Sequence, residues 1–144
     1  MKRAALLAIV AIFAVLSGVA YAAKPRTGTF KAAKGQVQLG YDLKFKVDKG
    51  GTRISNLVAH VLERCDGSST SSTTTVGPGL TWAVSKTGKF SGRKKESANG
   101  VTLYTTLTGT FTSAGKAVGT IRQESIVAGS TCDTLKLKFT ATRQ

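Results

Sequence analysis

Hydrolytic chemistry would need a nucleophile, a general base and a group that orients the base. The sequence has a single histidine, His60, and few carboxylates to place beside it. Cys65 could pair with His60, but a cysteine held in a disulfide is not a free thiolate. We therefore predict that the protein is not an enzyme, with a hydrolase centred on His60 as the weaker alternative. The acidic residues are Asp42, Asp48, Glu63, Asp66, Glu96, Glu124 and Asp133.

Metal and cofactor chemistry also lack the residue patterns that they require. A metal site would need more ligands than two thiols and one histidine provide. No pair of carboxylates is spaced for glycoside hydrolysis, and no glycine-rich phosphate loop opens a helix. The sequence therefore predicts no metal and no cofactor.

The basic residues are better organised than the acidic ones. Lysine and arginine number 21 against 7 acidic residues, for a net charge of +14. Lys44 and Lys46 are expected to project from the outward side of one strand, and Lys136 and Lys138 from another. The candidate anion-binding residues are these four lysines together with a predicted loop cluster of Arg93, Lys94 and Lys95. The alternative is that lysines simply mark the solvent side of a sheet.

A charge of this size favours anionic partners outside the cell. An anionic wall polymer, an acidic glycan or an anionic lipid surface would each fit, and no specific nucleic acid is indicated. We predict a non-catalytic binding module for anionic cell-envelope polymers or surfaces. One alternative is a structural or protein-interaction domain whose charge serves solubility only. A weaker one is a small secreted inhibitor that presents residues 93–100 to its partner.

The first 22 residues have the features of a signal peptide. Lys2 and Arg3 precede an apolar run over residues 4–16, and Ala20-Tyr21-Ala22 supplies small residues at the two positions that a signal peptidase reads. The apolar run is short for a membrane span of about 20 residues. We expect cleavage after Ala22, with an uncleaved anchor as the alternative. The expected location is secreted or associated with the cell envelope, with residues 23–144 forming one domain and no transmembrane span in it.

Export changes how the two cysteines are interpreted. In an oxidising compartment, two cysteines that are far apart in sequence most simply form one disulfide. We therefore predict a bond between Cys65 and Cys132. It would close a large loop, and the loop-closure entropy corresponds to roughly 4 kcal/mol of stabilisation.

The elements that must position these residues are strands. Apolar and polar residues alternate over 37–47, over 101–112 and over 135–142, which is the period-2 pattern of strands with one buried face. Residues 101–143 should form three consecutive strands joined by short turns. Short strands are also expected at 27–31, 80–84 and 88–92. Residues 66–75 and 93–100 have the composition of loops, the second ending in Asn-Gly.

Residues 52–65 are ambiguous between two secondary structures. The apolar residues fall at helical spacing, which is compatible with an amphipathic helix. β-branched residues and a preceding hairpin-like turn favour a strand, provided that a bulge near Ser55-Asn56 resets the inward side. We choose the strand. The predicted fold is all-β: an antiparallel two-sheet sandwich or jelly-roll relative with eight to nine strands and one disulfide.

A Gly-x-Phe pattern occurs at Gly28-Thr29-Phe30, Gly88-Lys89-Phe90 and Gly109-Thr110-Phe111. A glycine on the inward side leaves a gap that a large ring can cover. The unequal spacing excludes a solenoid repeat, so we interpret the three copies as equivalent packing devices or a trace of internal duplication.

Two further motifs are Gly119-Thr120-Ile121-Arg122 and, before a final strand, Cys132-Asp133-Thr134. In these motifs the sequence resembles a group of small exported bacterial proteins, and the resemblance covers roughly residues 27–143. Phe139 matches an aromatic residue in the last strand of that group, whereas Leu135 stands where its members often have glycine. The resemblance implies a disulfide-closed β-sandwich, and it implies no activity and no site residue.

Overall fold

The computed structural model describes residues 23–32, 42–66, 68–75 and 79–144, and the regular secondary structure in these ranges is all β. The predicted signal peptide lies outside the described residues, as does the 37–41 part of the predicted strand. No helix in the described ranges is long and apolar enough to cross a membrane. The strands are β1 (Gly28–Ala32), β2 (Leu43–Val47), β3 (Arg53–Cys65), β4 (Ser68–Thr75), β5 (Trp82–Ala83), β6 (Lys89–Ala98), β7 (Val101–Ser113), β8 (Lys116–Val127), β9 (Ser130–Asp133) and β10 (Leu137–Arg143).

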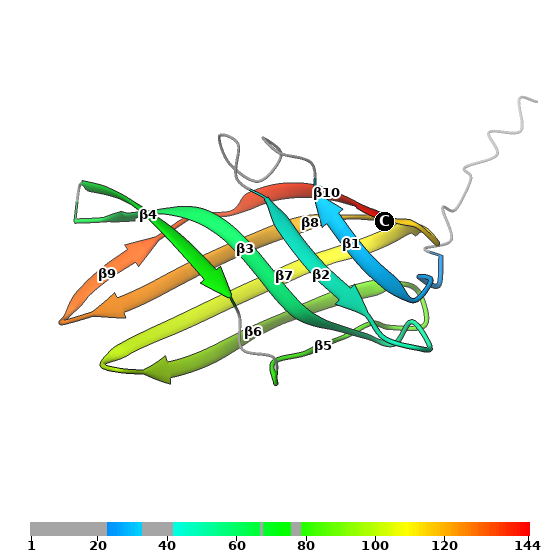
Figure 1. Ribbon diagram of the computed structural model, residues 1–144, viewed down its shortest axis with the longest axis horizontal. Coiled ribbons are helices and arrows are strands. Elements are labelled where there is room, and N and C mark those ends of the chain that lie inside the picture. The colour runs from blue at the N-terminus through cyan, green and yellow to red at the C-terminus, as the bar shows by residue number, and fades with distance from the viewer. Residues whose placement is uncertain (1–22, 33–41, 67, 76–78) are drawn as a thin grey trace, which may run out of the picture.

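These strands pair antiparallel in one continuous sheet with the order β10-β1-β2-β3-β9-β8-β7-β6 (Figure 1). The sheet also returns on itself, because β10 pairs with β8 as well as with β1. On the far side, β5 pairs with β3, and an isolated bridge between Val84 and Phe90 links this edge to β6. The all-β antiparallel class is confirmed. A single connected sheet is compatible with the predicted two-sheet arrangement but does not by itself divide into two sheets.

Residues 52–65 are a strand with a bulge, as the β-branched residues indicated. Lys44 pairs with Val58 and Lys46 pairs with Ser55, so β3 carries one residue more than β2 across this interval. Asn56 supplies the extra residue with a φ of 49°, a conformation that asparagine tolerates better than most residues. The bulge places Ile54 and Leu57 on the same buried side of the strand.

Two segments that were predicted to be loops are strands. Residues 68–75 form β4, which pairs along β3 from Val58 to Cys65. The Ser/Thr composition suggested a loop, but threonine is also a good strand former and the edge of β3 provides a pairing partner. Residues 93–98 extend β6, so the prediction of a charged loop over residues 93–100 is wrong. The turn is reduced to Asn99-Gly100, whose φ angles of 50° and 77° fit a two-residue hairpin turn between Ala98 and Val101.

The core is built around stacked aromatic rings. Phe30 lies parallel to Phe45 at 5.5 Å between centroids, and Phe111 meets Phe30 edge-on at 5.3 Å. Trp82 is buried, and its indole N–H donates a hydrogen bond to the carbonyl oxygen of Gly92 at 3.0 Å. This bond satisfies the one polar group of the tryptophan side chain.

The Gly-x-Phe motifs act across strands rather than within one strand. Gly109 is paired with Phe90 on β6, and a Cβ added to Gly109 would lie 2.6 Å from the Phe90 ring. Gly119 is paired in the same way with Phe139 on β10. Each ring therefore covers the gap left by a glycine on the neighbouring strand. The packing role predicted from sequence is present, but the partner is one that the motif alone does not identify.

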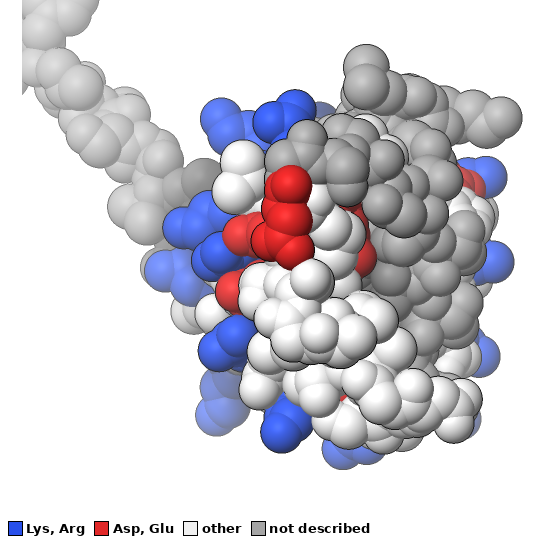
Figure 2. Space-filling view, turned by 90° about the vertical axis from the view of Figure 1, so that its left-hand side faces the viewer, with Lys and Arg blue, Asp and Glu red and all other residues white. Residues whose placement is uncertain are grey.

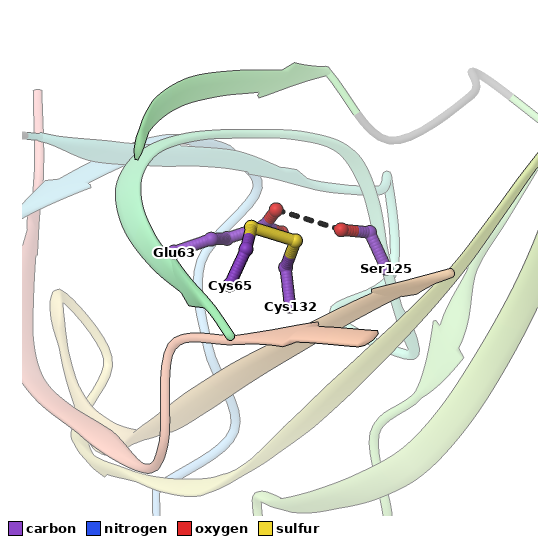
Figure 3. The surroundings of a disulfide bond; sticks show 4 residues. All are labelled: Glu63, Cys65, Ser125 and Cys132. Carbon is purple, nitrogen blue, oxygen red and sulfur yellow. Dashed lines mark hydrogen bonds between the residues drawn. A yellow bond between two sulfur atoms is a disulfide. The ribbon is translucent and has the colours of Figure 1, made fainter. Parts of the chain in front are cut away.

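The predicted disulfide is confirmed. Cys65 on β3 and Cys132 on β9 lie directly opposite each other and are bonded (Figure 3). Beside them, Ser125 on β8 donates a hydrogen bond to the buried carboxylate of Glu63 at 2.8 Å. The disulfide and this hydrogen bond join β3 to the β8–β9 hairpin at one end of the sheet.

Candidate anion-binding surface

Lysines from three strands form a row across the outer face of the sheet. Lys44 on β2 lies opposite Lys31 on β1, Lys31 lies opposite Thr142 on β10, and Thr142 lies opposite Lys116 on β8. All three lysines are exposed. Directly opposed residues have Cβ atoms about 5 Å apart, and like charges at that distance repel. The row therefore concentrates positive charge on a short stretch of surface.

Two further lysines project from the same face. Lys46 follows Lys44 at the next outward position of β2, and Lys138 is exposed on β10, opposite Thr120. We define the lysine face as Lys31, Lys44, Lys46, Lys116 and Lys138. Lys136, the fourth lysine predicted from sequence, is exposed between β9 and β10 and lines a small hollow of about 240 Å³ with Arg64.

One carboxylate borders the lysine face. Asp42 lies 3.7 Å from the ammonium group of Lys31, and it contacts the Nδ1 atom of His60. The hydrogen bond with His60 lowers the pKa of Asp42, against the opposing effect of burial. Asp42 therefore stays ionised and neutralises part of the charge at one corner of the row.

The same contact bears on the hydrolase alternative. Asp42 supplies the carboxylate that could orient His60 as a base. Among the residues whose side chains the structure describes, which exclude those of β4 opposite His60, no serine or threonine hydroxyl is hydrogen-bonded to His60, whose side chain is 39% exposed. The pair thus has an orienting group without an identified nucleophile, and the prediction that the protein is not an enzyme stays a prediction.

The cluster of Arg93, Lys94 and Lys95 lies in β6, and one of its three charges is paired with a carboxylate. The guanidinium of Arg93 stacks 4.0 Å from the Tyr104 ring centroid and lies 3.2 Å from a carboxylate oxygen of Glu124. Lys95 flanks the same ring at 5.9 Å, and Lys94 is half-buried on the other side of the strand. This region differs from the lysine face because Arg93 contacts both a carboxylate and an aromatic ring.

Beyond Glu124, the chain of ion pairs continues to β9. Arg122 lies 3.4 Å from Glu124 and makes a closer, two-pronged contact with Asp133, with a shortest distance of 2.5 Å. The hydrogen bonds from Arg122 lower the pKa of Asp133, although burial acts in the opposite direction. The outer face of β6 to β9 is consequently a mixed-charge surface.

One end of the molecule carries a basic group that the sequence did not reveal. The start of β1, the turn after β2 and the end of β10 meet there, at the right of Figure 1. The backbone N–H groups of Arg26 and Arg143 donate to the carbonyls of Ala114 and Gly115, both at 2.9 Å, which ties these segments together. We define the basic end as the exposed residues Lys24, Arg26, Lys49, Arg53, Lys86 and Arg143.

The basic end has little compensating charge. Asp48 is the carboxylate in its β2–β3 turn, and it accepts hydrogen bonds from the backbone N–H groups of Thr52 and Arg53 at 2.9 and 3.1 Å. The other acidic residues lie toward the opposite ends of their strands, and Figure 2 shows carboxylates at that opposite end. These basic residues are scattered in sequence and become neighbours only through strand pairing. The only feature of the sequence that could have predicted the basic end is that these residues lie beside turns.

No group of three or more potential metal ligands occurs among the described residues. No protein-family model, no curated protein and no solved structure matches this chain. The resemblance to small exported bacterial proteins therefore stays a prediction, and the function must be argued from the surface itself.

Proposed function

We propose that this protein is an exported, non-catalytic module that binds an extended anionic polymer of the cell envelope through its lysine face. The observation that carries the proposal is the row of Lys44, Lys31 and Lys116, because Lys44 and Lys31 are directly opposed and Asp42 offsets only the charge of Lys31. Such an arrangement has a repulsive cost that bound anions would relieve. The proposal that the protein is exported rests on the predicted signal peptide. The disulfide is compatible with an oxidising compartment.

A linear polyanion suits this surface better than a single small anion. The lysine face spans four neighbouring strands, from β2 to β8, and the adjoining basic end extends the positive surface past the strand ends. Lysine acts as a flexible point charge, which suits repeated phosphate or carboxylate groups rather than one fixed geometry. Binding should weaken steeply with ionic strength, because exposed charges are screened by salt.

The test is co-sedimentation with a purified anionic wall polymer, and with linear polyphosphate immobilised on beads, from low to moderate salt. One variant replaces Lys31, Lys44 and Lys46 with glutamine. The matched control replaces Arg93, Lys94 and Lys95 with glutamine, which removes the same charge from β6, away from the lysine face. We expect the first variant to lose retention and about three of its salt-sensitive contacts, and the control to bind nearly as the unmodified protein does.

Equal losses in the two variants would contradict the proposal, since they would show that net charge alone governs retention. Absence of retention of the unmodified protein at low salt would favour the alternative, in which the charge serves solubility and the domain is structural or interacts with another protein.

A further inference from the structure

A hollow of about 700 Å³ lies on the outer face of β6, β7, β8 and β10, apart from the row of lysines. Two cross-strand rows form its sides. Lys89, Thr110 and Val118 are successive partners in one row, and Thr108, Thr120 and Lys138 are successive partners in the other. Ligand sites in proteins are commonly about 300–1,000 Å³, so the hollow is large enough for a small molecule.

Between the rows, the floor is bare backbone. Gly109 and Gly119 are direct partners in the β7–β8 pair and have no side chain on either face. The rings of Phe90 and Phe139 lie beneath them on the core side, within 2.9 Å of where a Cβ would be. The Phe139 ring is 3% exposed, so the floor presents no aromatic face on which a sugar ring could stack.

Two of the four threonines that line the hollow, Thr108 and Thr110, have hydroxyl groups that are engaged with a neighbour or buried. The Thr108 hydroxyl lies 3.3 Å from the Ser91 hydroxyl, with which it is hydrogen-bonded. The Thr110 hydroxyl oxygen is buried without a hydrogen-bond partner, although the residue is partly exposed, so its exposed part is the methyl group. Together with Val118, these methyl groups give the hollow an apolar lining.

The charged side chains that line the hollow are basic. Lys89 and Lys138 stand at diagonally opposite corners, and no carboxylate lines the hollow among the described residues. Either ammonium group can reach an anionic head group while an apolar chain covers the methyl groups and the glycine floor. An apolar chain would also remove water from a surface that has few polar groups to hydrate.

We propose that this hollow binds one molecule of an amphiphilic anion, a linear alkyl chain that carries a single carboxylate or sulfate. The alkyl chain lies across Val118 and the methyl groups of Thr108 and Thr110, and the head group pairs with Lys89 or Lys138. This site shares Lys138 with the lysine face. The two proposals are tested separately, because the polymer variant changes neither Val118 nor these two lysines.

The experiment titrates monomeric dodecanoate into the purified protein by calorimetry, with dodecanol and acetate as separate probes. The first variant, Val118→Glu, places a carboxylate in the hollow. Thr106→Glu is its matched control, because Thr106 lies on the same outer face of β7 but outside the hollow. The second variant combines Lys89→Gln with Lys138→Gln. Fluorescence of the buried Trp82 verifies that each variant is folded.

We expect saturable 1:1 binding of dodecanoate, at least about tenfold weaker in Val118→Glu and unchanged in Thr106→Glu. The lysine double variant should weaken dodecanoate binding and leave dodecanol binding unchanged. The proposal is overturned if dodecanoate does not bind, if acetate binds as well as dodecanoate, or if Val118→Glu binds as tightly as the control. Polymer retention of Val118→Glu, measured in parallel, separates failure of this site from failure of the lysine face.

Discussion

Replacing Gly119 with alanine tests the close packing at the centre of the sheet. Gly119 does not have a positive φ, so its backbone conformation is open to alanine. Space is the constraint. An added Cβ would lie 2.3 Å from the carbonyl oxygen of Thr108 and 2.9 Å from the Phe139 ring, whereas real Cβ contacts essentially never fall below 3.0 Å. The nearest obstacle is backbone within the β7–β8 pair, which a side-chain rotation cannot remove.

Two effects of opposite sign determine the magnitude. Replacing glycine with alanine at an unstrained position stabilises a protein by about 0.4–1 kcal/mol, because the unfolded chain loses conformational freedom. Forcing an extra methyl group into a well-packed region costs about 1–3 kcal/mol. Because the Cβ would have to move the carbonyl as well as the ring, we place the cost at the upper end. The unfolding free energy of Gly119→Ala should therefore fall by about 2 kcal/mol.

The assay is urea unfolding at neutral pH, followed by the fluorescence of Trp82, the only tryptophan in the chain. Gly79→Ala is the matched control, since a Cβ there meets no atom within 4 Å and its φ is not positive. The control should be as stable as the unmodified protein or slightly more so. The double variant Gly119→Ala with Phe139→Leu should remain destabilised, because it relieves the ring contact and not the carbonyl contact. A Gly119→Ala midpoint at or above that of the unmodified protein would refute the reasoning.

Three further predictions concern stability. Replacing Cys65 and Cys132 with alanine should lower the unfolding free energy by about 4 kcal/mol, because a loop of 67 residues is no longer closed; a loss below 1 kcal/mol in urea unfolding would contradict this. The pKa of Asp133 is below its ordinary value near 3.8, so this carboxylate stabilises the fold above that pH and the contribution is lost as the pH falls through the lower, folded-state pKa. Asp133→Asn should accordingly be less stable at pH 7 and lose less stability on acidification from pH 5 to 2, and parallel acid profiles would disprove the role of its pairing with Arg122. Trp82→Phe should cost about 1–3 kcal/mol, measured by circular dichroism in urea, because the partly buried carbonyl of Gly92 loses its donor. An unchanged midpoint would show that this carbonyl has another donor.

The alternation of apolar and polar residues was sufficient to predict a strand and its inward side wherever the strand has one buried and one exposed face. The alternation over residues 101–112 predicted which side of β7 is inward, and Thr105, Leu107 and Phe111 are buried as expected. The bulge at Asn56 was also predictable, since the break in alternation required one extra residue. These features depend on side-chain direction, which has a fixed period along an extended chain.

Tertiary structure decided what composition left undetermined. Residues 68–75 and 93–98 became strands because β3 and β7 present backbone groups that need partners, a condition that neither segment encodes. The register of the strands also decided which aromatic ring packs against each glycine of the β7–β8 pair. Gly109 is covered by the ring of Phe90, which lies on β6.

For the candidate anion-binding surface, too, some features could be predicted from the sequence and others depended on the tertiary structure. The sequence by itself determined that Lys44 and Lys46 face outward together, because alternate residues of a strand share a face. It also determined the excess of positive charge and the pairing of its two cysteines. Only strand pairing decided that Lys31 lies opposite Lys44, that Arg93 is neutralised by Glu124, and that distant basic residues gather at one end. The physical reason is that charge acts through space, so its effect depends on which strands become neighbours rather than on spacing along the chain.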